Sequence, residues 1–416
     1  MLEIRFDGVS QEFEGHEVLH QVTCSFHAGR VTAIAGANGS GKSTLLRLAG
    51  RLMLPTSGTI GVFRDGAAIG GADYRSLISM ATPEMELYTR LTVRENLEFL
   101  LSVRGMDCEE KDLRKLLDRM GLSAEVLPRR TGQLSTGMRQ RVRLAVLLGV
   151  DAEVWLLDEP GLALDAGVHC SHWKRVLRQI AGVSFCGRRM IGRKERRQMH
   201  ALIFHAARQV AYKELLDGIR HYAGYVTMGM FALTVIAFIS MSLAGGAAEV
   251  RLVAALFWMI LFFAATLQGE RLFAEEAAAG TLLFLRIYVP AQAVLFGKMT
   301  AHFITLLILA VIAVPLVLIL MDAAFVLDAS FCAVLLLGLW GMAAADTLLA
   351  AVAANASVRG GLIPVLLLPS MLPILLPAIA LTAGEGEPAL LGGMLIYDMA
   401  LTVGASMLFD SLWIES

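Results

Sequence analysis

Hydrophobic and polar positions divide the chain into two parts of different character. Up to about residue 220 charged residues are dense, whereas long apolar runs fill the rest. A helix needs about 20 apolar residues to cross a bilayer, and six runs are long enough. They lie near 222–244, 252–268, 301–321, 331–354, 361–382 and 388–409. The pattern predicts a charged N-terminal part followed by an all-α transmembrane domain of six helices.

Basic residues between these spans predict an orientation. The loops after the second and fourth spans hold Arg271, Arg286, Lys298 and Arg359. The loops at 322–330 and 383–387 hold acidic residues but no Lys or Arg. By the positive-inside rule, both termini are expected in the cytoplasm. The N-terminus has neither a basic n-region nor an apolar h-region, which predicts no signal peptide and a cytosolic first half.

Two features inside the predicted spans leave alternatives open. The fifth span contains Pro364, Pro369, Pro373 and Pro377. Each proline removes a backbone donor, so we expect a bent or broken helix, either a hinge in a transport path or an irregular packed element. Asp346 and Asp398 also lie within spans, where a carboxylate is costly. They are either functional groups facing the bundle interior or anchors at the membrane interface.

Composition limits the possible partners. Hydrophobic residues make up 56% of the 416 residues and charged residues 18%, below the roughly 25% that is usual for soluble domains. The net charge of -1 gives no reason to expect a nucleic-acid partner. The five cysteines show no CxxC or Cys/His metal spacing, which predicts reduced packing residues.

The most informative motif is a GxxxxGK[ST] run at 36–44, between the apolar segment 31–35 and an amphipathic segment at 43–48. We expect a buried strand before it and a helix after it, which is the setting of a phosphate-binding loop. Backbone N–H groups of such a loop surround nucleotide phosphates, and glycines allow their close approach. Lys42 would reach the terminal phosphates, and Ser43 would offer its hydroxyl to Mg²⁺. The expected ATP-binding residues of the loop are Gly36, Asn38, Gly39, Ser40, Gly41, Lys42, Ser43 and Thr44.

Two later motifs narrow the class of nucleotide-binding protein. LSTGMRQR at 134–141 resembles the signature sequence of ABC transporters, and LLDEP at 156–160 resembles their Walker B strand. The resemblance implies an α/β P-loop ABC nucleotide-binding domain, with residues 92–130 as its helical subdomain and 162–165 as a loop at a dimer interface.

The ABC resemblance also implies roles for individual residues. Phe13 would stack on adenine, Asp158 would hold Mg²⁺, and Glu159 would act as the general base. Ser135 and Gly137 would contact the γ-phosphate bound to the other subunit of a homodimer.

Two departures from the family pattern place hydrolysis in question. Pro83 occupies the position where the family carries a glutamine, with Glu84 as a partial substitute. No histidine ends the stretch at 183–189, where the family has a switch histidine after a strand. We therefore expect an ATP-binding domain at 1–165 that is truncated, a basic linker or remnant at 166–198, and a transmembrane domain at 199–416. Loss of one group that stabilises a transferring phosphate commonly costs on the order of 10²–10³ in rate.

The membrane half resembles the CcmB subunit of the cytochrome c maturation heme exporter, and the first half resembles its CcmA ATPase. The resemblance rests on Glu275-Glu276-Ala277-Ala278-Ala279-Gly280-Thr281-Leu282 running to Tyr288-Val289-Pro290, and on the end of the chain at 408–410. It implies ATP-driven, heme-linked export across a bacterial cytoplasmic membrane. It also implies CcmC-like and CcmD-like partners and a periplasmic heme chaperone. His302, in the third span, is interpreted as a packed or interfacial residue and not as an iron ligand.

Two other functions remain open. ABC-2-type exporters of a lipid, drug or polysaccharide share several of these membrane motifs. Alternatively, the chain is a nucleotide-gated membrane scaffold that binds ATP and hardly hydrolyses it, as Pro83 and the missing histidine suggest. The sequence alone does not identify the cargo or its direction.

Overall fold

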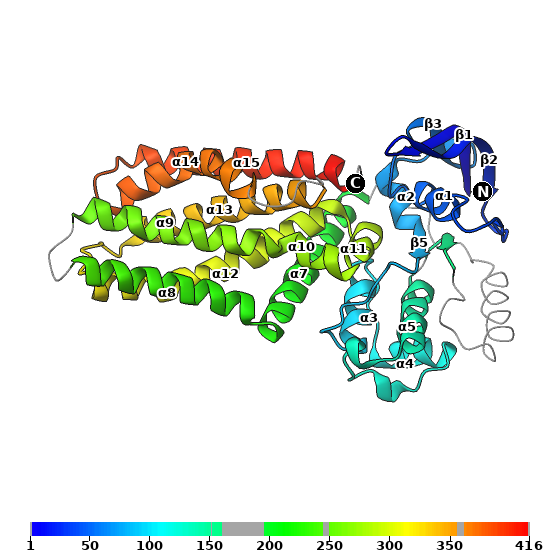
Figure 1. The fold of residues 1–416 in the computed structure, drawn as a ribbon, viewed down its shortest axis with the longest axis horizontal. Helices are drawn as coiled ribbons and strands as arrows, with labels where there is room; N and C mark the ends of the chain where they lie inside the picture. Colours follow the sequence, from blue (N-terminus) through cyan, green and yellow to red (C-terminus); the bar gives the residue numbers. More distant parts are fainter. Residues whose placement is uncertain (1, 151, 160–194, 244–248, 356–361, 415–416) are drawn as a thin grey trace. The chain divides into compact units, whose positions relative to one another are not determined.

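The computed structural model describes residues 2–150, 152–159, 195–243, 249–355 and 362–414 (Figure 1). The chain separates into two compact units. The first unit contains residues 1–206, 279–290 and 413–416, and the second contains 207–278 and 291–412. Leu162–Asp165, most of the predicted linker at 166–198 and Cys170 and Cys186 lie outside the described residues.

The first unit contains two described sheets. One has four antiparallel strands in the order β2-β1-β3-β4, and the other has two parallel strands, β5 and β6. The strands are β1 (Leu2–Phe13), β2 (His16–His27), β3 (Ser57–Arg64), β4 (Ala67–Ala68), β5 (Ile78–Ala81) and β6 (Val154–Leu157).

Alternation of side chains explains the first sheet. In β1, Leu2, Ile4 and Phe6 are buried, as expected for one face of a strand whose residues alternate between its two sides. Phe6 packs edge-on against Phe26 of the paired strand, with ring centroids 5.8 Å apart. The buried face of the sheet therefore follows directly from the sequence pattern.

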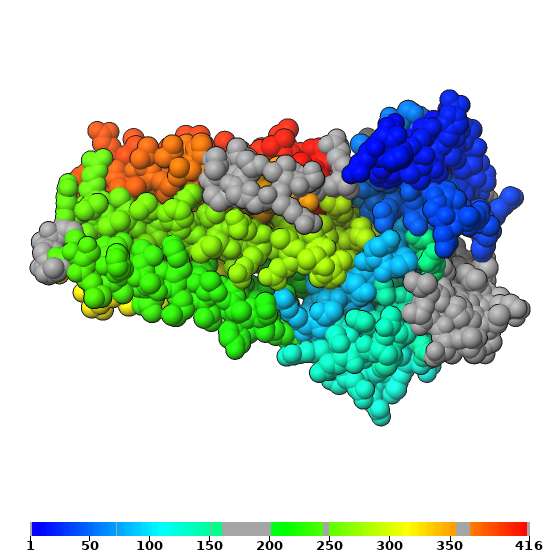
Figure 2. Space-filling view, in the orientation of Figure 1, coloured from blue at the N-terminus to red at the C-terminus, as the bar shows by residue number. Residues whose placement is uncertain are grey.

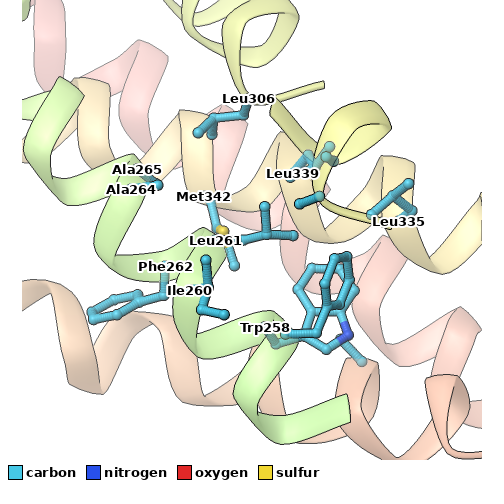
Figure 3. Packing of buried hydrophobic residues seen from close by; sticks show 14 of the residues in the cluster. Trp258, Ile260, Leu261, Phe262, Ala264, Ala265, Leu306, Leu335, Leu339 and Met342 are labelled. Carbon is cyan, nitrogen blue, oxygen red and sulfur yellow. The ribbon is translucent and has the colours of Figure 1, made fainter. Parts of the chain in front are cut away.

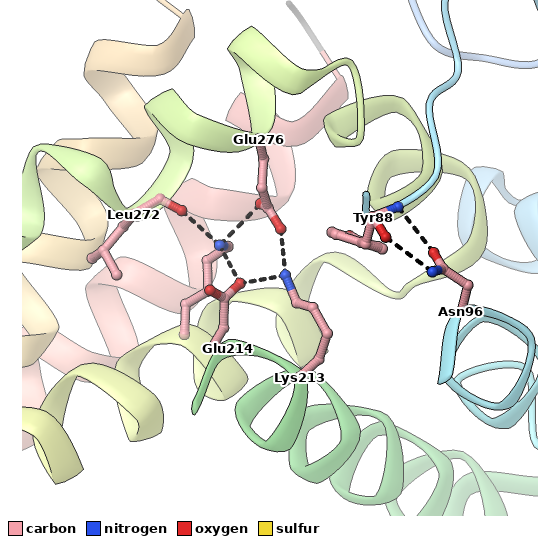
Figure 4. Close-up of polar contacts among 7 residues, drawn as sticks. Tyr88, Asn96, Lys213, Glu214, Leu272 and Glu276 are labelled. Atoms are coloured by element: carbon pink, nitrogen blue, oxygen red, sulfur yellow. Dashed lines mark hydrogen bonds and ion pairs between the residues drawn. The ribbon is translucent and has the colours of Figure 1, made fainter. Parts of the chain in front are cut away.

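Helices occupy the predicted helical segment at 92–130. Thr92 caps α3 in a reciprocal capping box: Thr92 Oγ1 accepts from Glu95 N–H, and Glu95 Oε2 accepts from Thr92 N–H. Asn96, on the first turn of α3, holds both the N–H and the C=O of Tyr88 (Figure 4). The helices of this unit before residue 160 are α1 (Lys42–Ala49), α2 (Gly71–Leu77), α3 (Val93–Ser102), α4 (Glu110–Arg119), η1 (Ala124–Val126), η2 (Thr131–Gln133) and α5 (Thr136–Gly149).

The strand predicted at 31–35 is wrong. This segment has no regular secondary structure, and Val31 is 65% exposed. A buried strand needs neighbours for its backbone hydrogen bonds, and none of the described strands pairs with it. Apolar composition alone therefore does not make this segment a strand. The helix predicted after the glycine-rich run is confirmed as α1.

The remaining helices belong mainly to the second unit. Five helices among the described residues are long and apolar enough to cross a membrane, matching five of the six predicted spans. The fifth predicted span corresponds to α14, whose apolar stretch at Leu367–Thr382 is shorter. The helices are α7 (Glu195–Arg220), α8 (Ala223–Leu243), α9 (Val250–Gly269), α10 (Arg271–Ala279), α11 (Leu282–Tyr288), α12 (Ala291–Leu320), α13 (Ala329–Asn355), α14 (Leu362–Thr382) and α15 (Ala389–Ile414).

Burial differs strongly between these helices. The apolar windows of α9 and α13 are 56% buried, whereas those of α8 and α15 are 17% buried. The green side chains of α8 accordingly lie on the visible surface of the second unit in Figure 2. Helices α9 and α13 therefore form the centre of the bundle, and α8 and α15 present apolar side chains outward, as expected for helices in lipid.

The core of the second unit packs around α9 (Figure 3). Trp258 is fully buried, and its indole N–H donates to Thr382 Oγ1 at 2.9 Å. Gly338 of α13 makes room for this ring, since an added Cβ would lie 2.4 Å from it. The aromatic ring and the glycine opposite it thus fix how closely α9 and α13 approach.

The prolines of the fifth span do not end its helix. Pro369, Pro373 and Pro377 all lie inside α14. Each still removes one backbone donor from the helical ladder. The choice between a transport hinge and a packed irregular helix therefore stays open.

The predicted loop position of Lys298 is wrong. It was expected in a loop, but α12 begins at Ala291, so Lys298 lies inside a helix and is 0% exposed. The physical reason is the presence of two glutamates, the buried Glu276 and the half-buried Glu214, that neutralise its charge.

Candidate functional site

Residues 36–40 of the glycine-rich run form an exposed loop, Gly41 is buried, and residues 42–44 are the first residues of α1. Gly39 and Gly41 have φ angles of 81° and 84°, which residues with a Cβ rarely adopt. An added Cβ on Gly41 would also lie 2.7 Å from Leu19 Cδ2, and one on Gly36 would lie 2.6 Å from Ser40 Oγ. Gly41 is thus favoured by both the backbone conformation and the space, Gly39 by the backbone conformation and Gly36 by the space.

Lys42 points back over this loop. Its Nζ donates to the carbonyl oxygens of Gly36 at 2.9 Å and Ala37 at 2.7 Å. The ammonium group therefore lies on the concave side of the loop, where a phosphate would be expected. A phosphate binding there would exchange two neutral acceptors for charged oxygens, which form stronger hydrogen bonds.

Asp158 and Glu159 follow β6 at the edge of the two-stranded sheet. The N–H of Asp158 donates to Ala81 O at 2.9 Å, which extends the parallel ladder by one residue. Asp158 is 6% exposed, whereas Glu159 is exposed and has a positive φ of 42°. A positive φ in a residue with a side chain is uncommon and is often found at functional sites. The two adjacent carboxylates thus differ in environment, one buried at the sheet edge and one open to solvent.

Ser135 begins the helix that carries the signature sequence. Its Oγ accepts from the N–H of Met138 at 3.2 Å and so caps α5. Gly137 lies in the first turn of this helix. The N-terminus of α5 therefore presents free N–H groups and a positive dipole end, which suit an anion.

Phe13 ends β1, beside the turn to β2, and its side chain is 41% exposed. An exposed aromatic ring is able to stack on a base. The adenine contact of Phe13 stays a prediction, and so do the roles predicted for the other site residues.

The loop at 82–86, which contains the glutamine substitution, is held by two arginines. Arg143 of α5 donates to Pro83 O at 3.1 Å and to Met85 O at 2.6 Å. Glu84, expected to replace the glutamine in part, instead pairs with Arg47 of α1 at 3.1 Å. The position of Glu84 is therefore set by an arginine.

Sequence reasoning missed a polar contact between residues far apart in the chain. The segment 279–290 belongs to the same compact unit as β5. The hydroxyl of Tyr288 lies 2.7 Å from Ser79 Oγ and donates to Met80 O at 3.2 Å. All these side-chain atoms are buried, and burial raises the pKa of Tyr288. The Tyr-Val-Pro signal in the sequence marked this segment but did not reveal its contact.

Arg104, after α3, adds a second connection to this segment. Its guanidinium donates to Arg75 O and Ile78 O, each at 2.9 Å, and to Ile287 O at 2.7 Å, and it lies 5.1 Å from the Tyr288 ring centre. Burial lowers the pKa of Arg104 to about 10. Gly280 completes the contact at the other end, where its carbonyl accepts from Glu86 N–H at 3.2 Å. The segment is therefore fixed at both ends, to the start of β5 and to the loop after it.

A separate charged cluster, the Lys–Glu quartet, lies in the second unit (Figure 4). Lys213 contacts Glu214 at 2.7 Å and Glu276 at 2.6 Å, while Lys298 contacts Glu214 at 2.6 Å and Glu276 at 2.9 Å. Lys298 also donates to Leu272 O at 2.6 Å. Burial alone would raise the pKa of Glu214, but the charges and hydrogen bonds of the two lysines lower it to about 2. Two positive and two negative charges thus balance within helices α7, α10 and α12.

His302 and Asp346 form a second buried polar contact in that unit. His302 Nε2 lies 3.1 Å from Asp346 Oδ2, and both side chains are 0% exposed. Gly269 of α9 makes room for Asp346, because an added Cβ would lie 3.2 Å from the carboxyl carbon. Asp398 is 2% exposed and packs beside Gly341. The structure therefore favours the bundle interior for both aspartates over the membrane interface, and it confirms His302 as a packed residue.

The first unit fits a nucleotide with Mg²⁺. The loop at 36–44 offers a glycine-lined cradle with Lys42 on its concave side. Ser43, on the first turn of α1, and Asp158 are the oxygen ligands of the kind that Mg²⁺ prefers. Among the described residues no group of three or more His, Cys, Asp or Glu side chains is suited to hold a metal ion on its own.

Comparison with known families finds one match in each half of the chain. Residues 19–161 match the family model for ABC transporter, and residues 205–410 match the model for CcmB protein. The prediction of an ABC-type ATPase followed by a CcmB-like membrane domain is confirmed.

Curated relatives match the N-terminal part. The chain is 38% identical over 185 residues to the sulfate/thiosulfate import ATP-binding protein CysA of Brucella suis, covering 43% of this chain and 51% of that protein. It is 37% identical over 189 residues to the methionine import ATP-binding protein MetN of Caulobacter vibrioides, covering 44% and 55%. The chain thus spans about half the length of the curated relatives it matches. Among solved structures, the ATP-binding cassette MJ0796 in a dimeric post-hydrolysis state with ADP and Pi is 26% identical, with a TM-score of 0.39, over 43% of this chain and 82% of that chain.

Proposed function

We propose that this chain is one half of an ATP-driven exporter that works as a homodimer, because residues 19–161 match the ABC transporter family model and residues 205–410 match the CcmB protein model. One chain supplies both an ABC-type ATPase domain and a membrane domain. A homodimer then provides two of each, and its two ATP sites would each combine a phosphate loop with the signature helix of the partner.

One observation supports coupling between ATP hydrolysis in the first domain and transport through the membrane domain. The segment 279–290 lies within the CcmB match, yet it packs in the same compact unit as the ATPase strands. Tyr288 and Arg104 hold it to β5, whose next residues reach the edge where Asp158 lies. The segment also connects directly to α10 before it and α12 after it. A shift of the sheet edge on nucleotide binding would therefore reach two helices of the membrane domain.

The proposed chemistry uses groups of the loop at 36–44, of the start of α1 and of the sheet edge after β6. Bound Mg²⁺ supplies positive charge that stabilises the phosphates. Ser43 and Asp158 would hold the ion, while Lys42 and the loop N–H groups would bind the phosphate oxygens. Glu159, exposed beside them, would take the proton from the attacking water. Ser135 and Gly137 of the partner subunit would close the site over the γ-phosphate.

We propose heme-linked export for cytochrome c biogenesis as the physiological role, in a bacterial cytoplasmic membrane with both termini cytoplasmic. The CcmB match and the acidic run before Gly280 support this role. CcmC-like and CcmD-like subunits and a periplasmic heme chaperone would be its partners. The curated relatives have names that refer to sulfate, iron or methionine import, so similarity in the ATPase domain does not identify a cargo.

The alternative function is a nucleotide-gated membrane scaffold. Pro83 stands where the family has a glutamine, and Glu84 is paired with Arg47. Steady-state ATP hydrolysis by the reconstituted protein separates the two, with Lys42→Ala and Glu159→Gln variants as controls. Turnover well above both controls supports the exporter. Turnover equal to the controls together with tight ATP binding supports the scaffold.

The shared ATP sites have their own test. Lys42→Ala and Ser135→Arg subunits should each be inactive alone, since each damages every site of its homodimer. When the two are mixed before reconstitution, a mixed dimer contains one intact site, with Lys42 from one subunit and Ser135 from the other. Partial recovery of hydrolysis supports the dimer, and no recovery in dimers shown to be mixed argues against shared sites.

Cargo is tested by stimulation of hydrolysis. Heme added to the reconstituted protein should raise turnover, and the same addition should have no effect on the Lys42→Ala variant. Stimulation by a lipid or drug with no response to heme would instead favour an ABC-2 type of exporter.

A further inference from the structure

The loop at 82–86 contains the position where the family has a glutamine. Few groups of this loop are available to replace that side chain. Pro83 has no N–H and its carbonyl accepts from Arg143. Glu84 pairs with Arg47, and Glu86 lies near Arg143, with its N–H bonded to Gly280 O. Of the polar side chains in this loop, Thr82 is the one with no partner among the described residues.

The register of the sheet places Thr82 beside Asp158. Ala81 pairs with Leu157 in the parallel ladder, and the bond from Asp158 N–H to Ala81 O continues it. Thr82 and Asp158 are therefore the residues that directly follow the paired Ala81 and Leu157. Residues at the same level of adjacent parallel strands point to the same face of the sheet, about 5 Å apart. Thr82 and Asp158 are thus the next positions of the two strands, level with one another at the end of the ladder.

The hydroxyl of Thr82 is buried without a hydrogen bond. Thr82 is 4% exposed, and its Oγ1 has no partner in the described structure. Buried polar groups are nearly always satisfied, so a buried hydroxyl with no protein partner next to the metal-binding carboxylate expected at Asp158 is a candidate contact for a bound group. The carbonyl of Thr82 is already used by Met85 N–H, which fixes the backbone while leaving the side chain available.

We propose that Thr82 takes the place of the missing glutamine, with its hydroxyl holding the water shell of the metal beside Asp158. A hydroxyl both donates and accepts, so it suits a water molecule that is already bound to a cation. This inference rests on the proposed ATP-binding function. It makes Thr82 a positioning residue that acts through the metal-bound water and does not touch the phosphates.

The test measures binding of a fluorescent ATP analogue to the full-length protein in detergent, once with Mg²⁺ and once with EDTA. Thr82→Val keeps the shape of the side chain and removes the hydroxyl. We expect it to weaken binding about tenfold with Mg²⁺, because one hydrogen bond in a charged site is lost, and to leave binding in EDTA unchanged. Thr82→Ser should bind like the natural protein. Thr59→Val, on an exposed position of β3, serves as a matched control.

Three results overturn the inference. They are equal binding by Thr82→Val and the natural protein with Mg²⁺, an equal loss with Mg²⁺ and with EDTA, and no effect of Mg²⁺ on the natural protein. An equal loss would show a structural role. Failure of the proposed function looks different, because then the natural protein binds no nucleotide or Lys42→Ala binds it equally well.

Discussion

Removing one lysine of the Lys–Glu quartet should destabilise the membrane unit, and removing a glutamate together with it should cost less than the two separate losses added together. Lys298→Met keeps most of the apolar stem of the side chain but removes its charge. Lys298 is 0% exposed and lies within 2.9 Å of both glutamates, so the variant leaves one lysine of the quartet, Lys213, against the carboxylates of Glu214 and Glu276. One negative charge is then uncompensated.

The magnitude follows from the burial. Breaking a buried ion pair by removing one partner costs about 3–5 kcal/mol, because the remaining charge loses its counter-ion without regaining water. Lys298 also donates to Leu272 O, and that carbonyl would lose its partner. We therefore expect Lys298→Met to lower the free energy of unfolding by about 4 kcal/mol.

The double variant Lys298→Met/Glu276→Gln gives the sharper expectation. It removes one charge of each sign and leaves Lys213 paired with Glu214, a neutral arrangement. Its loss should therefore be smaller than the sum of the two single losses by about 2 kcal/mol, within the usual range for residues in contact. Glu275→Gln, at the exposed neighbouring position, should change stability by less than about 0.5 kcal/mol.

The assay is denaturant unfolding in mixed micelles, followed by tryptophan fluorescence, with Trp258 in the core of the same unit as a reporter. Additive losses in the double variant would refute the reasoning, because they would mean that the charges do not stabilise one another. A loss below about 1 kcal/mol for Lys298→Met would also refute it, because the lysine would then be hydrated and not buried.

Three further outcomes are expected. Tyr288→Phe should lower the melting temperature of the full chain, because Ser79 Oγ loses a buried partner at about 1–3 kcal/mol, whereas Ser79→Ala should add little to it in the double variant. Thr92→Ala removes one half of the capping box and should cost about 1 kcal/mol in denaturant unfolding, whereas Thr92→Ser should be neutral. The lowered pKa of Glu214 stabilises the fold above about pH 4.5, where the unfolded group is ionised, and this part is lost as the pH falls toward 2. Melting temperatures measured between pH 6 and pH 3 should therefore fall less in Glu214→Gln than in the natural protein.

Hydropathy placed the membrane helices but misjudged Lys298. A window average detects an apolar run of sufficient length, and five spans among the described residues agree with it. It counted Lys298 as a loop residue because a lone lysine is costly in a membrane helix. The glutamates that neutralise it come from α7 and α10, 84 residues away for Glu214 and on another helix for Glu276. No local window contains that information.

The strand predicted at 31–35 failed for a related reason. An apolar run states that a segment prefers burial, but a strand exists only when neighbouring strands satisfy its backbone. Neither the four-stranded sheet nor the sheet of β5 and β6 extends to this segment in the described residues. The loop and helix that follow were predicted correctly, because glycines with positive φ and a helix start depend on local conformation.

The sequence by itself determined the chemistry available to this protein. The spacing of Gly36, Gly41 and Lys42, the signature at Ser135 and the acidic pair after β6 name the ATPase class, because short motifs carry local geometry. Only the tertiary structure decided which distant groups meet. It brought Tyr288 to Ser79, Arg143 to the carbonyl of Pro83, and Lys298 to its glutamates. Such contacts arise from packing between elements far apart in the chain, where burial converts a weak polar preference into a specific pairing.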